Sequence, residues 1–319
     1  MIDTSQAEKR IVTRFYNYLS INGDRVIKGA PKDRFIKETE WFREAKNIIP
    51  DNIPHIFDFD KQIDSTTSNI DLSYYEMQAI DGQNLYQWSG ENKNRANETF
   101  DRLISLTKTF HKKSYLPKND DIYQMYYLKP KTALTSFLKE SKIDKDSLVI
   151  NDQEVSNPLQ HLDEVYQNLE ARLQKTRYSF IHGDLTMSNT MIDKAGKLYL
   201  IDPRGGFGNT NVIGDVRYDV AKLYYSIVGN FDSLNNGRFS YIPGLKRENS
   251  HYYSIDDSGF GNLERKIIDG FNEDEELIKY IHSTIWLSLI PHVSNDRNQQ
   301  LCVFCHAVTL LNNIQKNEK

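Results

Sequence analysis

The hydrophobic pattern of the chain changes near residue 80, and this change limits the folds that the chain can adopt. Up to that point most apolar residues fall in short β-branched and aromatic runs, at 11–21, 25–28, 54–60 and 70–79. Beyond it they recur with the roughly 3.6-residue period of amphipathic helices, over residues 94–114, 119–140, 155–176, 216–229, 273–290 and 297–316. Strand character returns only at 178–202 and 239–255. The pattern predicts an α+β fold, with a small β-rich N-lobe (residues 1–78) and a larger, mainly helical C-lobe (residues 79–319).

Two local signals add detail to the N-lobe. Asn22-Gly23 lies between two apolar runs, and an Asn-Gly pair there predicts a β-hairpin, because both central residues of a type I′ turn need positive φ. Residues 32–47 have helical spacing, and the apolar face of the predicted helix consists of Phe35, Ile36, Trp41, Phe42 and Ala45.

Charge and hydropathy exclude several classes of function. The formal net charge is −4 with both signs interspersed, whereas nucleic-acid binding usually needs a concentrated basic surface. No apolar run approaches the roughly 20 residues that span a bilayer, and the N-terminal sequence MIDTSQAEKR lacks the apolar centre of a signal peptide. The only cysteines are Cys302 and Cys305, so no disulfide framework is expected. We expect a cytoplasmic protein that neither binds nucleic acid nor inserts into membranes.

The segment 178–205, YSFIHGDLTMSNTMIDKAGKLYLIDPRG, places polar residues at the ends of predicted strands. YSFIH is a short apolar strand, and residues 191–201 form a hairpin that stops at Asp202. Asp184 and Asn189 lie in the loop between them. Side chains at strand ends converge on a ligand while the backbone stays fixed, so this segment is the best candidate for a site.

Phosphoryl transfer requires the residue types that this segment contains. It needs a carboxylate to orient the attacking hydroxyl, oxygen ligands for Mg²⁺, and a cation for the phosphates. Asp184 would be the base, and Asn189 and Asp202 the metal ligands. The spacing Asp-x4-Asn, with a second Asp 13 residues further on, matches the catalytic loop and metal-binding Asp of protein kinases. A single Asp or Asn in a turn usually bonds to the backbone, but the combination favours the functional interpretation.

With these residues the segment resembles the Brenner motif region of the aminoglycoside phosphotransferase and choline kinase families. Ile-Asp-Pro-Arg-Gly at 201–205 and GDVRYDVAKLYYSIVGNFD at 214–232 resemble most closely the kinase-like proteins of capsular polysaccharide biosynthesis. The resemblance implies a two-lobed protein-kinase-like fold, ATP as phosphoryl donor, Mg²⁺, and a small-molecule hydroxyl acceptor such as a sugar or capsule precursor.

The same resemblance implies further roles in the C-lobe. His182 matches a residue that braces the catalytic loop, and Asp219 matches an Asp that bonds to this loop from the next helix. The alternative for Asp219 is a surface or helix-start position. Arg204 either meets a substrate phosphate, pairs with Asp219, or forms a purely structural salt bridge.

On the nucleotide side, Lys28 ends the strand RVIK and matches the kinase lysine that contacts the α- and β-phosphates. We expect Glu38, rather than Glu40 or Glu44, to be its ion-pair partner. The segment Tyr75-Glu76-Met77-Gln78 resembles the kinase hinge, so the backbone of Glu76, Met77 and Gln78 would bind the base; the alternative is an ordinary strand end.

Two features depart from the protein-kinase pattern. Residues 4–14, where a phosphate-covering loop would precede Lys28, contain no glycine, although such loops usually need glycine. This absence motivates the alternative of a non-catalytic pseudokinase or regulatory module, against which the retained site residues argue. Gly183 also replaces the Arg that reads a phosphorylated activation loop, so regulation of that kind is not expected. Nucleotidyl transfer by the same fold is a third possibility.

Two other motifs have simpler explanations. Cys302-Val-Phe-Cys305-His306 fits a haem-attachment pattern, but it lies in an apolar helical stretch, where cysteine behaves as a small hydrophobe; we predict core packing. The acidic run at 273–276 either attracts a cationic substrate or provides the carboxylates that favour a helix start, and the second interpretation is preferred.

Overall fold

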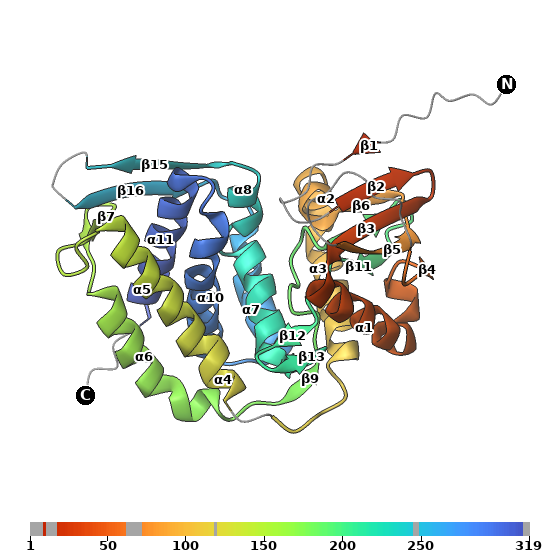
Figure 1. Cartoon of the computed structure of the whole chain (residues 1–319), viewed down its shortest axis with the longest axis horizontal. Coiled ribbons are helices and arrows are strands. Elements are labelled where there is room, and N and C mark those ends of the chain that lie inside the picture. The colour runs from red at the N-terminus through yellow and green to blue at the C-terminus, as the bar shows by residue number, and fades with distance from the viewer. Residues whose placement is uncertain (1–8, 11–17, 62–71, 118–119, 245–248, 315–319) are drawn as a thin grey trace. The chain divides into compact units, whose positions relative to one another are not determined.

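An antiparallel sheet of five strands occupies the N-terminal region of the chain (Figure 1). The computed structural model describes residues 9–10, 18–61, 72–117, 120–244 and 249–314. The chain divides into two units. Unit 1 contains residues 1–113, 180–206 and 211–213, and unit 2 contains residues 114–179, 207–210 and 214–319. These units do not test the lobe boundary at residue 78, which stays a prediction.

The sheet of unit 1 has the strand order β1-β2-β3-β5-β4, and every neighbouring pair is antiparallel. Its strands are β1 (Lys9–Arg10), β2 (Tyr18–Asn22), β3 (Arg25–Pro31), β4 (Ile56–Asp58) and β5 (Leu72–Gln78). Residues 11–17 and 70–71 of the predicted strands lie outside the described residues.

The predicted hairpin is present, but its turn is shifted by one residue. Asn22 pairs with Arg25, so the two central residues are Gly23 and Asp24 rather than Asn22 and Gly23. Gly23 has φ +60°, a conformation that costs glycine little. The correction follows from register, because Asn22 is used as the last paired residue of β2.

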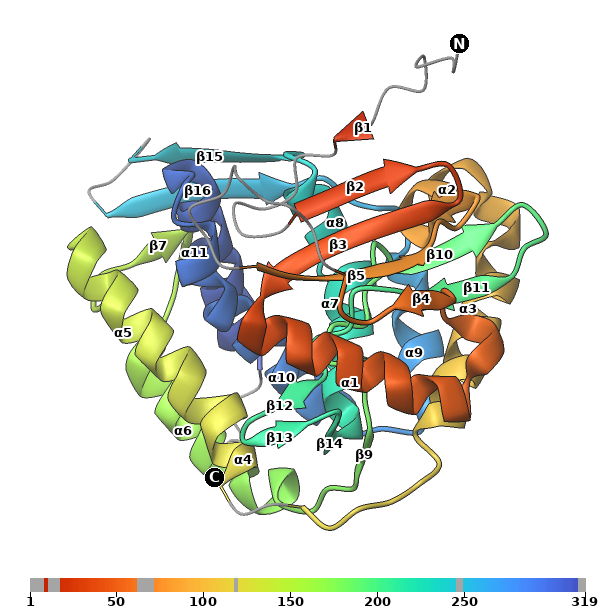
Figure 2. The same ribbon diagram turned by 45° about the vertical axis from the view of Figure 1, so that its right-hand side comes forward.

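Helix α1 (Lys32–Ile48) packs against β3 and β5 (Figure 2). Trp41, Phe42 and Ala45 are buried as predicted. Ile36, however, is 39% exposed, whereas Glu38 is completely buried. The helix therefore turns a carboxylate, rather than an isoleucine, toward the interior.

The rest of unit 1 is built around a second sheet, of order β11-β10-β6. Its elements are η1 (Pro50–Asn52), β6 (Gly82–Asn84), α2 (Leu85–Glu91), α3 (Lys93–Phe110), β10 (Thr190–Asp193) and β11 (Leu198–Leu200). Strands β10 and β11 form the predicted hairpin. Gly82 lies so close to β10 that an added Cβ would be 2.1 Å from the carbonyl oxygen of Ile192.

Unit 2 is mainly helical, with α10 packed against α5, α7 and α11 (Figure 1). Its helices are α4 (Asp121–Tyr123), the π-helical turn η2 (Gln124–Leu128), α5 (Lys129–Ser141), α6 (Pro158–Leu173), α7 (Val216–Ile227), α8 (Phe231–Asn235), η3 (Gly261–Leu263), α9 (Glu264–Phe271), α10 (Glu275–Leu289), η4 (Ile290–Val293) and α11 (Arg297–Asn312). The α+β class is therefore confirmed, with a β-rich N-terminal region and a helical C-terminal region.

A four-stranded sheet of order β15-β16-β7-β8 completes unit 2. Its strands are β7 (Val149–Ile150), β8 (Gln153–Glu154), β15 (Phe239–Pro243) and β16 (Ser250–Ile255). Four short strands lie where the chain passes between the units, namely β9 (Tyr178–Phe180), β12 (Gly206–Phe207), β13 (Thr210–Asn211) and β14 (Ile213–Asp215). In the part of the chain that is described, no helix is long and apolar enough to cross a membrane.

Core packing of the two cysteines and a helix start at the acidic run were the preferred interpretations, and both agree with the structure of unit 2. Cys302 and Cys305 are completely buried in α11, and burial raises the pKa of the Cys302 thiol to about 12. The prediction of core packing is confirmed. In the acidic run, Asp274 caps α10 by accepting hydrogen bonds from the backbone N–H groups of Glu276 and Leu277, as the helix-start interpretation requires.

Candidate active site

The structure brings together Lys28 on β3 and Glu38 on α1. Lys28 Nζ donates to Glu38 Oε2 at 2.8 Å, and both residues are buried, at 5% and 0% exposure. The Tyr75 hydroxyl donates to the same carboxylate oxygen at 3.0 Å. Buried charges need such partners, because an isolated ion in the interior is costly. The Lys28–Glu38 contact is therefore a fixed part of unit 1.

Arg34, which the sequence analysis did not identify, completes this cluster. Its Nε donates to Glu38 Oε1 at 2.5 Å, and its Nη2 donates to Asp202 Oδ1 at 3.0 Å. Lys28 Nζ also bonds to Asp202 Oδ1. The four side chains of Lys28, Arg34, Glu38 and Asp202 thus alternate in sign around a closed ring, which we call the charge ring.

The charges of the ring shift the pKa values of Asp202 and Arg34. Burial favours the neutral form of Asp202, but Lys28 and Arg34 outweigh this effect and lower the pKa of its carboxyl group. Burial likewise opposes the charge of Arg34, but Asp202 and Glu38 raise the pKa of its guanidinium. Asp202 is therefore an anion at neutral pH, with its side chain 34% exposed.

His182 holds the loop of Asp184 against the segment that contains Asp202. Its Nε2 lies 3.0 Å from the carbonyl oxygen of Ile201, and its Nδ1 accepts a hydrogen bond from the Asp184 backbone N–H at 3.2 Å. The carbonyl oxygen of His182 accepts from the backbone N–H of Arg204 at 3.0 Å. His182 is completely buried, and its contacts are those of a bracing residue.

Asn189 fixes the other end of this loop. The side-chain Nδ2 of Asn189 donates to the backbone carbonyl oxygen of Asp184 at 2.9 Å. The backbone carbonyl oxygen of Asn189 accepts a hydrogen bond from the Ile201 backbone N–H at 3.0 Å. Because Nδ2 is engaged, the amide oxygen Oδ1 is the atom of Asn189 that is suited to a cation. Asp202, which has φ +58°, is the residue after Ile201. The hydrogen bond between the backbones of Ile201 and Asn189 therefore links the segments of both predicted metal ligands.

Arg204 approaches Asp184, a partner that the sequence analysis did not consider. Its Nε lies 3.4 Å from Asp184 Oδ2. The Arg204 side chain is 40% exposed and that of Asp184 is 17% exposed, so the pair is open to solvent on one side. Asp219 is completely buried, so a surface position for this residue is wrong. It lies in the first turn of α7, so the helix-start alternative agrees with the structure, and its predicted bond to the catalytic loop stays a prediction.

The proposed hinge residues form the end of β5 and lie inside the sheet. Glu76 and Met77 pair with residues of both β3 and β4, and the Gln78 backbone N–H donates to the carbonyl oxygen of His55 at 2.8 Å. The Glu76 carboxylate pairs with Lys61 at 3.1 Å and also with Arg25. Nothing in these contacts tests binding of a base, which stays a prediction.

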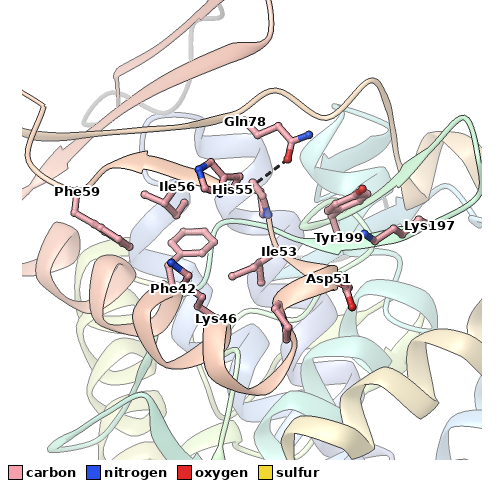
Figure 3. A pocket seen from close by; sticks show the side chains of 12 residues that line it. Phe42, Lys46, Asp51, Ile53, His55, Ile56, Phe59, Gln78, Lys197 and Tyr199 are labelled. Atoms are coloured by element: carbon pink, nitrogen blue, oxygen red, sulfur yellow. Dashed lines mark hydrogen bonds between the residues drawn. The ribbon is translucent and has the colours of Figure 1, made fainter.

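A cavity of about 400 Å³ lies in unit 1 between the second half of α1 and β4 (Figure 3). Aromatic and basic side chains line it, including Phe42, Phe59, Lys46, Lys197 and Tyr199. Of the predicted site residues only Gln78 lines this cavity, where its Oε1 accepts a hydrogen bond from the His55 backbone N–H. None of the four residues of the charge ring lines it, so this cavity and the charge ring are different places.

All the predicted catalytic and metal-binding residues lie in unit 1. Within the described residues no cluster of three or more His, Cys, Asp and Glu side chains could hold a metal ion. A Mg²⁺ site with two protein ligands is compatible with this, since Mg²⁺ usually keeps waters and substrate phosphates as its other ligands. Arg34 could have been found from its spacing, because residues four apart lie on one face of a helix and Arg34 precedes Glu38 by that distance.

Several solved structures that are similar to this chain are small-molecule kinases. One is the aminoglycoside phosphotransferase APH(2'')-Ib with bound ADP, which has 16% sequence identity and a TM-score of 0.55 over 96% of this chain and 92% of that chain. Another is the streptomycin–ATP–APH(2")-IIa ternary complex, with 16% identity and a TM-score of 0.54 over 95% and 91%. A third is the choline kinase LicA from Streptococcus pneumoniae, with 14% identity and a TM-score of 0.52 over 96% and 93%. At this identity the likeness establishes the fold, and the predicted protein-kinase-like fold is confirmed.

Sequence comparison assigns the family. No curated protein matches the chain. The model of the phosphotransferase enzyme family matches residues 22–244, a range that includes every residue predicted for the site. This match confirms the prediction of a small-molecule phosphotransferase, and the chain belongs to the phosphotransferase enzyme family.

Proposed function

We propose that the chain transfers the γ-phosphoryl group of ATP to a hydroxyl group of a small molecule, with Mg²⁺ as cofactor. The observation that carries this proposal is the charge ring, in which Lys28 contacts both Glu38 and Asp202. A cation held beside a predicted metal ligand is the arrangement that phosphoryl transfer needs. ADP and ATP in the similar structures agree with a nucleotide donor.

Asn189 and Asp202 would hold Mg²⁺. Both supply oxygen atoms, which Mg²⁺ prefers, and the low pKa of Asp202 keeps its carboxylate charged. When bound, the ion would offset the negative charge of the phosphates during transfer. Lys28, fixed by Glu38, would bind the phosphates that stay with the nucleotide.

Asp184 would orient the acceptor hydroxyl and take its proton. The hydroxyl oxygen attacks the γ-phosphorus while the bond to the β-phosphate oxygen breaks, and the hydroxyl proton passes to the Asp184 carboxylate. Backbone contacts with His182 and Asn189 hold Asp184 in place. The Arg204 Nε, 3.4 Å from Asp184 Oδ2, would hold the Asp184 carboxylate in position for the acceptor.

The N-lobe of residues 1–78 would bind the nucleotide, with its base at the backbone of Glu76, Met77 and Gln78. The C-lobe of residues 79–319 would bind the acceptor. We propose a sugar or capsular polysaccharide precursor as acceptor, on the resemblance of segments 201–205 and 214–232 to capsule-associated kinases. Transfer would take place in the cytoplasm, where ATP is present.

Asp184→Asn tests this function. We expect phosphate transfer from γ-labelled ATP to a panel of sugars and amino alcohols to fall by roughly 10²- to 10⁴-fold, the usual contribution of a general base. The Kd for Mg-ATP, measured by calorimetry, should stay within about threefold of the wild-type value, because a group that acts on the acceptor contributes little to nucleotide binding. Asp101→Asn, an exposed position on α3, is the matched control. Near-normal transfer by Asp184→Asn would refute the base assignment. Mg-ATP binding by the wild type without any transfer or hydrolysis would favour the pseudokinase alternative.

A further inference from the structure

Arg34 is a charged residue of the ring that the proposed mechanism does not use. Its side chain is only 25% exposed, and it contacts Glu38 and Asp202 at the same time. It lies in the first turn of α1, where the positive end of the helix dipole does not favour a cation. A guanidinium held in such a place depends on the carboxylates beside it.

The ring as it stands carries no net charge, since two cations face two anions. Lys28 and Arg34 both bond to one oxygen of Asp202, Oδ1. A Mg²⁺ ion on Asp202 would bring further positive charge against both cations, and like charges at this distance repel strongly. One of the two cations must then find another anion, and the nucleotide brings more negative charge than one Mg²⁺ ion cancels.

We propose that Arg34 binds the phosphates of the nucleotide, exchanging its contact with Asp202 for phosphate oxygens when the Mg²⁺-nucleotide binds. This inference rests on the proposed function. Arg34 is better suited to the exchange than Lys28, whose side chain is 7% exposed. A planar guanidinium also donates to two phosphate oxygens at once, which an ammonium group does not.

The sequence before Arg34 gives this role a reason. No glycine occurs in residues 1–22, whereas backbone N–H groups that cradle phosphates usually depend on glycine. A chain without such glycines needs another source of donors for the phosphates. Arg34 supplies up to five N–H donors next to Lys28, so a side chain takes the place of a backbone cradle.

Calorimetric titration with Mg-ATP, Mg-ADP and adenosine tests the proposal on the whole chain. We expect Arg34→Gln to weaken Mg-ATP binding by roughly 10- to 100-fold, the effect of one or two lost hydrogen bonds to a charged group, and to leave adenosine binding unchanged. Arg34→Lys should recover part of the loss. Arg43→Gln, on the exposed side of the same helix with its guanidinium over the Phe59 ring, is the matched control. Thermal melting of each variant reports whether it is folded.

Each result separates one explanation from another. If Arg34 only competes with Mg²⁺ for the Asp202 carboxylate, Arg34→Gln will bind Mg-ATP more tightly than the wild type, and the proposal is overturned. Equal loss of adenosine and Mg-ATP affinity would mean a structural role and would also overturn it. If the wild type itself binds no Mg-ATP, the proposed function fails. If the wild type binds Mg-ATP and Arg34→Gln binds it with the same affinity, only the inference about Arg34 is overturned.

Discussion

Replacing Glu38 with glutamine should destabilise unit 1 through the charge ring. The Glu38 carboxylate is completely buried and accepts hydrogen bonds from Lys28, Arg34 and Tyr75. An amide of nearly the same shape has one oxygen and one NH₂ group. In either orientation the NH₂ group of the new side chain faces at least one donor.

The contacts set the expected magnitude. With the amide oxygen toward Lys28 and Tyr75, the NH₂ group faces Arg34. The Arg34 side chain is 25% exposed, more than those of the other two donors, so it can turn toward water. A lost hydrogen bond to a charged group costs about 1.5–3 kcal/mol, and a broken buried ion pair costs about 3–5 kcal/mol. Since Asp202 still neutralises part of the cationic charge, we expect a loss of about 2–4 kcal/mol.

Urea unfolding at pH 7 measures this loss, with Glu44→Gln as the control. Glu44 lies on the same helix and is exposed, so its replacement should change the free energy of unfolding by less than about 0.5 kcal/mol. In the Glu38→Gln background, Lys28→Met should cost less than it does alone, because the two residues share one contact. A loss below about 1 kcal/mol for Glu38→Gln, or additive costs for the two changes, would refute the account of the ring.

Two further predictions concern packing and acid stability. Gly82→Ala should destabilise the chain by at least about 2 kcal/mol, because the added Cβ would meet the backbone of Ile192 at 2.1 Å; Gly90→Ala, with nothing within 4 Å, should be neutral or stabilising in urea unfolding. Burial lowers the pKa of His306 to about 4 from an unfolded value near 6.5, so the unfolded state binds more protons between these values. The contribution of His306 to the free energy of unfolding should therefore be fully retained above pH 6.5 and fall by up to about 3 kcal/mol toward pH 4. Burial also lowers the pKa of His251 and His282, so His306→Gln should make the decline of stability shallower without removing it; an equally steep decline in the variant would contradict the assignment.

The parts of the fold that could be predicted are those with long, repeated signals. Helices α1, α3, α6, α7, α10 and α11 lie within a few residues of the ranges that apolar periodicity predicts. Of these, α3 and α6 bury one face, whereas every residue of α7 is buried. The short helices α2, α8 and α9 (at most eight residues) were not predicted, because a window of two turns holds too few apolar positions to establish a period. The hairpin at residues 22–25 was predicted with the wrong central residues, because its register depends on the pairing of Asn22 with Arg25.

The site was predictable where its spacing is fixed by local geometry. Asp184, Asn189 and Asp202 could be selected because a loop and a hairpin determine their positions. The spacing of four residues links Arg34 to Glu38, but its second partner, Asp202, comes from a distant part of the sequence, so its place in the ring appears only when both carboxylates are in place. The contact of Arg204 with Asp184 was missed for the same reason, since neither residue predicts the other by spacing.

The exposed Ile36 and the buried Glu38 have one physical cause. Apolar periodicity alone would turn Ile36 inward, but this rotation would leave Lys28 buried without its carboxylate, at a cost larger than the roughly 1.5–3 kcal/mol gained by burying an isoleucine. The ring is stable because its charges cancel, and a ligand of only one sign would leave an uncompensated charge in a largely buried place. A ligand that brings both signs together, as a Mg²⁺-nucleotide does, can exchange partners with the ring and keep the total near zero. The charge neutrality of the ring therefore explains both why α1 turns Glu38 inward and why the site favours a ligand that carries both signs of charge.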